Sequence, residues 1–331
     1  MALRFGLIGC GPMGRRLAEE LIKLPDACLV AVADPADEAR AAAVEAYQAE
    51  AYAEPECLLA REEVDAVIVA TPSYLHAPLT IAAAQAGKHV FCEKPMALTL
   101  GDCDRMIAAA EAAGVKLMVG QVLRLMFPWW RIKELASEGQ LGAPVCADVT
   151  RVFRLGGRGW RARRDQSGGP LFEVNVHELD FLRQLCGEVA QVSTYGGRFL
   201  CENVDYPDAY HINLRFRSGA TAHLQGGCAS HASHFAGLVI CRGGTLTFGP
   251  GWGAAVLHRP AADPEPLAAP EDGAPRGLAW ELSSFVSWVL RGEPPVVTAH
   301  DGRAAVELAV AAYRSMESGQ PVDLPLAAGS R

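Results

Sequence analysis

Apolar runs alternate with amphipathic segments along the first 121 residues. Each apolar run is only a few residues long, and the segment after it repeats its apolar positions at helical spacing. Continuous apolar runs indicate strands that are buried on both faces, as in a parallel sheet. The alternation therefore predicts a doubly wound parallel sheet. The expected strands cover 3–8, 28–34, 64–72, 89–95 and 115–121.

The pattern changes after residue 121, where longer strand-like runs are separated by turn signals. The turns at 217–220 and 242–244 favour antiparallel pairing. Apolar helical segments at 171–186 and 278–292 are expected to cover one face of this second sheet. The sequence thus predicts two domains, 1–121 and 122–331, the second an α+β domain with a large, mostly antiparallel sheet. Its strands are expected at 144–154, 189–199, 209–216, 221–230 and 237–248.

Composition narrows the class of protein. The 331 residues are 50% hydrophobic and 21% charged, which suits a globular chain, and the net charge of −8 argues against nucleic acid or an anionic membrane as partner. No apolar run approaches the roughly 20 residues of a membrane-spanning helix. The ten cysteines include no C-x-x-C pair, so we expect reduced thiols, no metal site and a cytoplasmic location.

A glycine-rich turn follows the first expected strand. "GCGPMG" places Gly9, Gly11 and Gly14 in a G-x-G-x-x-G pattern, with Pro12 and Met13 between them. The glycines suit a tight turn, a close approach of the backbone to a pyrophosphate, and close packing of helix on strand. The phosphates would lie at the positive end of the helix. The pattern alone is weak, but its position between strand and helix predicts a Rossmann-type dinucleotide site.

The cofactor is expected to be NAD. Asp34 lies twenty positions beyond Gly14, at the end of the second expected strand. A carboxylate there accepts hydrogen bonds from the ribose hydroxyls and repels a 2′-phosphate, so NADP is less favoured. Arg40 could offset this preference.

Two further strand ends carry polar residues. "ATPSYLH" is expected to bring Thr71 and Pro72 to the cofactor, whereas His76 could contact it or serve as a cap or surface residue. In "FCEKPMAL", Lys94 is one of only 5 lysines beside 25 arginines. A desolvated lysine can release a proton near neutral pH and an arginine cannot, so Lys94 is a candidate for proton transfer.

These motifs, together with "GGPLFEVNVHELDFLRQLCG" (168–187) and the closing segment 298–325, resemble the Gfo/Idh/MocA family of glucose–fructose oxidoreductase and inositol dehydrogenase relatives. The resemblance runs nearly end to end. It implies NAD(P)-dependent oxidation or reduction of a sugar, cyclitol or related polyol. It also implies a homodimer or homotetramer built through the C-terminal sheet, and a cis bond between Lys94 and Pro95.

The resemblance also implies the catalytic roles. His177 would accept the hydroxyl proton while hydride leaves carbon for the nicotinamide, because an imidazole titrates near neutral pH. Lys94 from the first domain would bind the same oxygen, with Glu93 and Pro95 holding it in place. The plainer interpretations are a satisfied core histidine and a surface lysine.

The chain departs from the family pattern next to the histidine. Glu173 stands where aspartate is usual, and Asn175 where glycine is frequent. On a helix Glu173 would share a face with His177 and orient it, and both changes are expected to affect substrate choice more than reaction class. Asp180 is expected to be a structural partner.

Other residues give weaker signals. Gln121 is a candidate for cofactor contact and Arg124 for substrate contact, or both simply pack. The segment 151–166 holds six arginines around Trp160, and Arg163 and Trp160 are substrate candidates. It is either a solvated basic loop or a site for an anionic sugar. Alternative functions are a glycosidase that uses NAD transiently and a non-catalytic regulator that binds dinucleotide and sugar.

Overall fold

The computed structural model describes residues 2–137, 139–154, 158–251, 253–269 and 276–327. Residues 155–157 of the arginine-rich segment lie outside this part. So do residue 138, in a helix that the sequence predicts over 128–139, and residues 270–275, in an exposed loop that it predicts around 260–275. The chain forms two compact units. The first joins Met1–Val122 to Pro275–Arg303, and the second joins Leu123–Ala274 to Ala304–Arg331.

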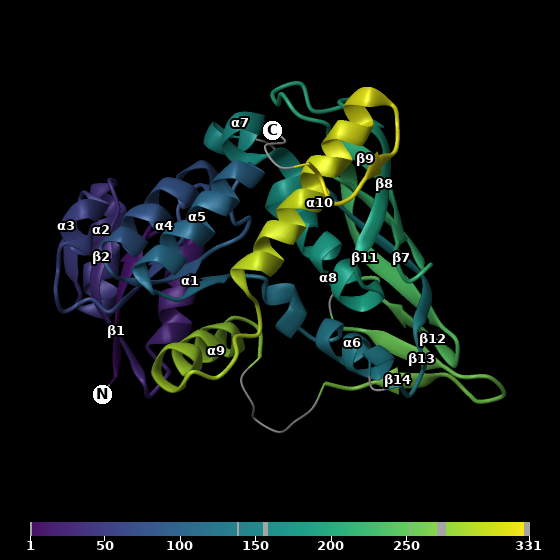
Figure 1. Ribbon diagram of the computed structural model, residues 1–331, viewed down its shortest axis with the longest axis horizontal. Helices are drawn as coiled ribbons and strands as arrows, with labels where there is room; N and C mark the ends of the chain where they lie inside the picture. The colour runs from purple at the N-terminus through teal and green to yellow at the C-terminus, as the bar shows by residue number, and fades with distance from the viewer. Residues whose placement is uncertain (1, 138, 155–157, 252, 270–275, 328–331) are drawn as a thin grey trace. The chain divides into compact units, whose positions relative to one another are not determined.

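The first unit contains a six-stranded parallel sheet in the order β3-β2-β1-β4-β5-β6 (Figure 1). The apolar runs of the sequence form its central strands, which confirms the predicted doubly wound sheet. The strands are β1 (Leu3–Ile8), β2 (Ala27–Ala33), β3 (Glu50–Tyr52), β4 (Ala66–Val69), β5 (His89–Cys92) and β6 (Leu117–Val119).

The strand order reverses between β1 and β4, and ligands of such sheets bind at the carboxyl ends of the strands beside this switch point. The loops that follow β1, β4 and β5 carry the sequence motifs described above. The helices of this unit are α1 (Pro12–Leu21), α2 (Asp37–Tyr47), α3 (Pro55–Leu59), α4 (His76–Gln85), α5 (Leu100–Ala113) and α9 (Leu278–Arg291).

Helix α9 belongs to the first unit, so the expectation that it covers the second sheet is wrong. It packs beside α1 (Figure 1). Phe285 is fully buried, and its ring lies 6.0 Å from that of Phe5 and 5.9 Å from that of Phe91. The apolar periodicity of α9 showed that one face is buried, but it carries no information about which sheet the helix covers.

The second unit contains a nine-stranded sheet in the order β14-β13-β12-β11-β7-β10-β9-β8-β15. Only the β7–β10 pair is parallel, so the expected mostly antiparallel sheet is confirmed. The strands are β7 (Pro144–Arg154), β8 (Val189–Gly197), β9 (Ala209–Phe216), β10 (Thr221–Gly227), β11 (Ala229–Cys241), β12 (Gly244–Phe248), β13 (Ala255–His258), β14 (Glu265–Leu267) and β15 (Val322–Asp323).

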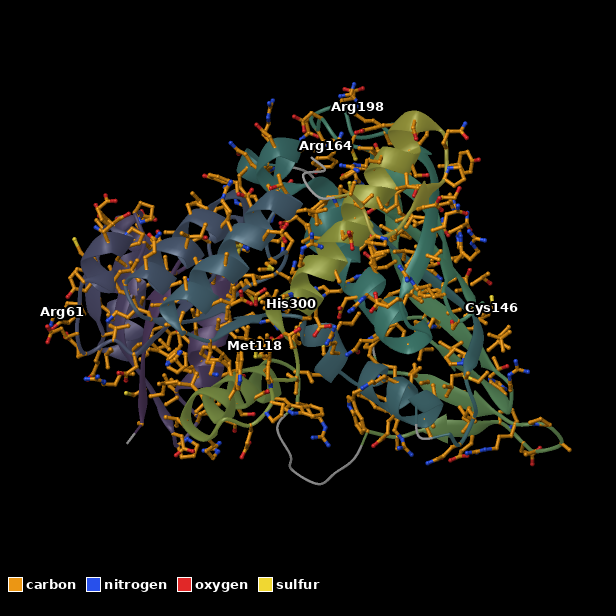
Figure 2. The ribbon with its side chains drawn as sticks, viewed as in Figure 1. Arg61, Met118, Cys146, Arg164, Arg198 and His300 are labelled. Carbon is orange, nitrogen blue, oxygen red and sulfur yellow. The ribbon has the colours of Figure 1, made fainter. Side chains whose placement is uncertain are left out.

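Helices α8 (Val176–Cys186) and α10 (Ala299–Ser318) lie along one face of this sheet (Figure 1). Trp129, at the start of α6 (Trp129–Ser137), fills the core between the rings of Phe181 and Phe248, each 4.6 Å from its own. Because successive side chains of a strand point to opposite faces, every second residue points to the face away from α8 and α10. Cys146 of β7 lies on that face (Figure 2). None of the described helices is long and apolar enough to cross a membrane.

The expected helix 171–186 begins differently from the prediction. Leu171–Asn175 form a π-helical turn, and α8 follows from Val176. Such turns are rare in proteins, but many of those known lie at functional sites. Two short 3-10 turns, Val122–Leu125 and Gly159–Ala162, and the short helix α7 (Arg164–Ser167) complete the elements used below.

Candidate functional site

The turn after β1 is shaped so that only glycine fits at two of its three positions. Gly9 has a φ of +98°, and a Cβ at Gly14 would lie 1.9 Å from the carbonyl oxygen of Gly9. A Cβ at Gly11 would instead enter open space. Gly11 is also the N-cap of α1, where no side chain caps the helix. The turn therefore offers a bare helix N-terminus beside an open surface, which fits the pyrophosphate of a dinucleotide.

Asp34 is fixed next to this turn. Its carboxylate accepts hydrogen bonds from the backbone N–H of Cys10 at 2.8 Å and from that of Ala36 at 2.9 Å. Each carboxylate oxygen keeps further acceptor capacity for a ribose hydroxyl. Arg40 donates to the backbone carbonyl of Asp34 at 2.7 Å and pairs with Asp37, so its guanidinium is anchored beside the acid.

His76 connects two loops at the carboxyl edge of the sheet. Its Nδ1 lies 2.7 Å from the carbonyl oxygen of Pro95, and its Nε2 lies 3.0 Å from that of Thr71. The side chain is only 1% exposed. Because both ring nitrogens face backbone and the ring is buried, the capping alternative is favoured, and direct cofactor contact by His76 stays a prediction. His76 ties the loop that carries Thr71 and Pro72 to the Lys94–Pro95 segment.

Lys94 follows β5, the strand that pairs with the switch-point strand β4. The Lys94–Pro95 bond is cis, as the resemblance implied. The Glu93 carboxylate accepts the backbone N–H of Lys94 at 3.1 Å, so the acid holds the lysine backbone as expected. Glu93 is 6% exposed and lies against Gly120, whereas Lys94 is half-buried and reaches solvent. Gln121 follows Gly120 and is 1% exposed.

The second unit carries Glu173, Asn175 and His177 on the π-helical turn and the first turn of α8. Glu173 keeps 12% of its side chain exposed, and one carboxylate oxygen lies 3.6 Å from Nε of Arg161. His177 is 8% exposed. An acid and an imidazole that both retain a little solvent access on one short segment are suited to proton transfer.

The Asn175 side chain lies inside the second unit. It is fully buried, donates to a Glu178 carboxylate oxygen at 3.0 Å and accepts from the Tyr210 hydroxyl at 2.6 Å. Both ends of the amide are thus engaged within the protein. The amide is therefore a structural group, and the effect on substrate choice expected of Asn175 stays a prediction.

Arg124 is also a structural residue in this arrangement. Its Nε and one terminal nitrogen each donate to Asp180 at 2.6 Å, and the side chains are 5% and 1% exposed. A guanidinium that is buried and paired in this way has few N–H groups left for another ligand. This favours the packing alternative expected for Arg124, whose substrate contact stays a prediction, and agrees with the structural role expected for Asp180.

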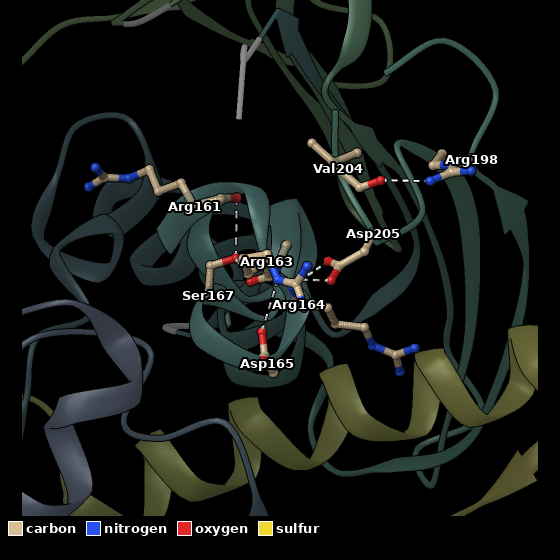
Figure 3. A network of polar contacts seen from close by, with 9 residues as sticks. Arg161, Arg163, Arg164, Asp165, Ser167, Arg198, Val204 and Asp205 are labelled. Carbon is tan, nitrogen blue, oxygen red and sulfur yellow. Dashed lines mark hydrogen bonds and ion pairs between the residues drawn. The ribbon is translucent and has the colours of Figure 1, made fainter. Parts of the chain in front are cut away.

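The described part of the arginine-rich segment forms a surface network with its neighbours (Figure 3). The Arg161 guanidinium lies 4.3 Å from the centre of the Trp160 ring. Arg163 is 60% exposed and lies 3.4 Å from Asp205, whose carboxylate also accepts the backbone N–H of Arg164. Carboxylates of neighbouring residues thus balance part of the positive charge of these arginines. Among the described residues, no group of three or more His, Cys, Asp or Glu is placed to hold a metal ion.

Sequence reasoning missed the residues that support the π-helical turn. Arg151 donates to Glu178 at 2.6 Å, and Glu178 and Tyr210 both bond to Asn175. A Cβ at Gly226 would lie 2.4 Å from the Tyr210 ring. The glycine pair at 226–227 inside an expected strand was a usable signal, since glycine in a strand often marks a close approach.

Comparisons with known proteins agree with this geometry. Residues 3–121 match a family model described as an oxidoreductase family with an NAD-binding Rossmann fold, and residues 129–247 match a GFO/IDH/MocA C-terminal domain. The chain is 29% identical to myo-inositol 2-dehydrogenase of Thermotoga maritima, over 97% of this chain and 98% of that protein. It is 30% identical to inositol 2-dehydrogenase 1 of Saccharopolyspora erythraea, over 99% and 98%. Alignments with several other curated relatives span 62–63% of those proteins.

Among solved structures, the WlbA dehydrogenase of Bordetella pertussis in complex with NADH and UDP-GlcNAcA is similar. Its TM-score is 0.87 at 26% identity, with 99% of this chain and 100% of that chain covered. The two domain matches, the full-length relatives and the glycine turn with its anchored Asp34 agree. This chain therefore belongs to the Gfo/Idh/MocA family of NAD-binding oxidoreductases.

Proposed function

We propose that the protein is an NAD-dependent dehydrogenase that oxidises a secondary hydroxyl of a sugar, cyclitol or related polyol. The position of Lys94 carries this proposal. It lies at the carboxyl end of β5, the strand that pairs with the switch-point strand β4, and Glu93 fixes its backbone. Relatives named as inositol dehydrogenases support the class of substrate.

We assign the cofactor to the first unit. The N–H groups at the start of α1 and the open surface at Gly11 would hold the pyrophosphate, Asp34 the ribose, and the loop at Thr71 and Pro72 the nicotinamide end. When bound, NAD supplies the hydride acceptor. The other residues assigned to the cofactor are Gly9, Pro12, Met13, Gly14 and Gln121. Residues 1–121 form the main part of the cofactor domain.

We assign the proton to two side chains. His177 accepts the hydroxyl proton, and the Lys94 ammonium donates a hydrogen bond to the same oxygen, which becomes a carbonyl. In the reducing direction the same groups polarise the carbonyl and return the proton. Glu173 orients the imidazole, and Trp160 and Arg163 remain candidates for substrate contact in residues 122–331.

We also propose a homodimer or homotetramer in the cytoplasm. The face of the second sheet opposite α8 exposes Tyr195 (66%) and Ile240 (40%), which suits contact with another copy. All ten cysteines, each in the described part of the chain, are free, which suits a reducing compartment.

A substrate screen tests the proposed activity. The purified protein is incubated with NAD and a panel of polyols, cyclitols and sugars, and formation of NADH is followed by absorbance. We expect NADH with at least one secondary alcohol. Release of aryl groups from aryl glycosides without net NADH would instead indicate the glycosidase, and cofactor binding without any turnover would indicate a regulator.

A further inference from the structure

We propose that Asn175 is a positioning residue whose buried hydrogen bonds set the junction between the π-helical turn and α8, and thereby place His177 and Glu173. This inference rests on the proposed function, because that function assigns catalytic roles to His177 and Glu173. Asn175 is the last residue of the turn, two positions before His177 and two after Glu173.

The junction is attached to the sheet through two strands. Tyr210 of β9 donates to Oδ1 of Asn175 at 2.6 Å, and Nδ2 of Asn175 donates to Glu178 at 3.0 Å. Arg151 of β7 donates to the other oxygen of Glu178 at 2.6 Å. The contacts form one chain, Tyr210–Asn175–Glu178–Arg151. His177 lies between Asn175 and Glu178 in sequence, so its backbone is fixed on both sides.

The environment makes these contacts strong. Asn175 and Glu178 are fully buried and Tyr210 is 1% exposed, so no water competes for the bonds. Burial raises the pKa of Tyr210 well above its ordinary value, and the hydroxyl therefore remains a donor at neutral and alkaline pH. Gly226 of β10 leaves room for the Asn175 side chain, because a Cβ at Gly226 would lie 2.5 Å from Oδ1 of Asn175.

A π-helical turn needs such support. It fits one more residue into each backbone hydrogen-bonded turn than an α-helix does, and it is rare because this arrangement is less favourable. An asparagine side chain with a donor and an acceptor can join the two adjoining elements at the point where the turn ends.

The test uses Asn175→Ala, Asn175→Asp and Tyr210→Phe, with Asn203→Ala, an exposed turn residue, as the matched control. Steady-state kinetics with the best substrate of the screen and titration with NADH are measured for each. In Asn175→Ala we expect kcat to fall by roughly ten- to a hundredfold, as misplacing a reacting group by about an ångström does. NADH affinity should stay unchanged, because the cofactor residues lie in the first unit.

Asn175→Asp gives a readout that a purely structural loss would not. Its carboxylate accepts from Tyr210 but repels Glu178, whereas the protonated carboxyl can donate to Glu178. Relative to wild type at each pH, kcat should therefore recover as pH falls from about 8 to about 6. Asn175→Ala should show no such recovery, because alanine has no group to protonate.

Two results would overturn the inference. One is a folded Asn175→Ala protein with kcat within about twofold of wild type. If that variant does not fold, Tyr210→Phe decides, since it keeps the ring and removes one hydrogen bond: unchanged kcat would then reject the role. Failure of the proposed function is distinct, because wild type would produce no NADH, or His177→Ala would remain fully active.

Discussion

Arg124 and Asp180 form a bidentate ion pair, with both donor–acceptor distances at 2.6 Å and almost no exposure to solvent. With its amide oxygen turned towards Arg124, Gln184 accepts from the same guanidinium. The pair joins the 3-10 turn Val122–Leu125 to α8, the helix that carries His177. Its function is therefore to hold the second unit together at the helix that carries a proposed catalytic residue.

Arg124→Ala is expected to destabilise the second unit by about 3–5 kcal/mol, because it leaves the Asp180 carboxylate buried and unpaired. Urea unfolding measures the loss, and the double variant Arg124→Met with Asp180→Leu should recover most of it. Arg259→Ala, in an exposed pair with Glu265, is the control and should cost at most about 1 kcal/mol. An Arg124→Ala protein of normal stability with a raised KM would restore the substrate role.

Two glycines of the same turn should respond differently to alanine. Gly11→Ala adds a Cβ to open space, so the fold should keep its stability while NADH binding weakens at least about tenfold, since the methyl group would keep the backbone from the pyrophosphate. Gly14→Ala would collide with the Gly9 carbonyl, so thermal unfolding should shift to lower temperature. Tight NADH binding by Gly11→Ala would contradict this cofactor assignment.

Asp34→Ala should weaken NAD more than NADP. The carboxylate lost is the acceptor for the ribose hydroxyls and the group that repels a 2′-phosphate, and Arg40 remains anchored beside the site. Competitive titration with both cofactors measures the ratio of dissociation constants. An equal loss for the two cofactors would show that Asp34 only supports the turn through Cys10.

Lys94→Ala and His177→Ala should each lower kcat at least about a hundredfold while NADH affinity is retained, because each removes a group that handles the proton. Lys116→Ala, another lysine of the first unit, serves as the control. Near-normal turnover in either catalytic variant would count against the assigned roles.

Stability of the first unit should fall as the medium becomes acidic, partly through His89. Burial, with Lys116 nearby, lowers the pKa of His89, and its Nδ1 accepts the backbone N–H of Lys116 at 3.0 Å. The unfolded chain binds the proton more readily, so the contribution is present above the ordinary pKa of histidine, about 6.5, and is lost as pH falls below it. Urea unfolding of wild type at successive pH values measures this loss.

His89→Gln should flatten that pH dependence, because glutamine does not titrate. His300→Gln, at an exposed histidine (Figure 2), should leave the dependence as in wild type. Parallel pH curves for wild type and His89→Gln would remove His89 from this account.

The sequence predicted both sheets because period and strand propensity are local. The run 3–8 is β1 and the run 209–216 is β9, each without a change of bounds. The sequence did not reveal β3 or α3, which are too short for a clear period. It left the roles of His76 and Arg124 open, because a polar residue near a motif looks the same whether its partner is a ligand or the protein.

The partners of Asn175 could not be found from the sequence. Tyr210 lies 35 positions after Asn175, and Arg151 reaches this group only through Glu178, so their meeting depends on sheet register. Spacing within a helix is read directly, but contact across strands needs the order of the strands.

Helix α9 decides where the chain can be cut to obtain the first unit as a separate fragment. A fragment that stops at residue 121 would lose Phe285 and leave a cavity lined by Phe5 and Phe91. The fragment would therefore expose apolar surface and aggregate. A usable nucleotide-binding fragment would need residues 278–291 grafted back through a linker.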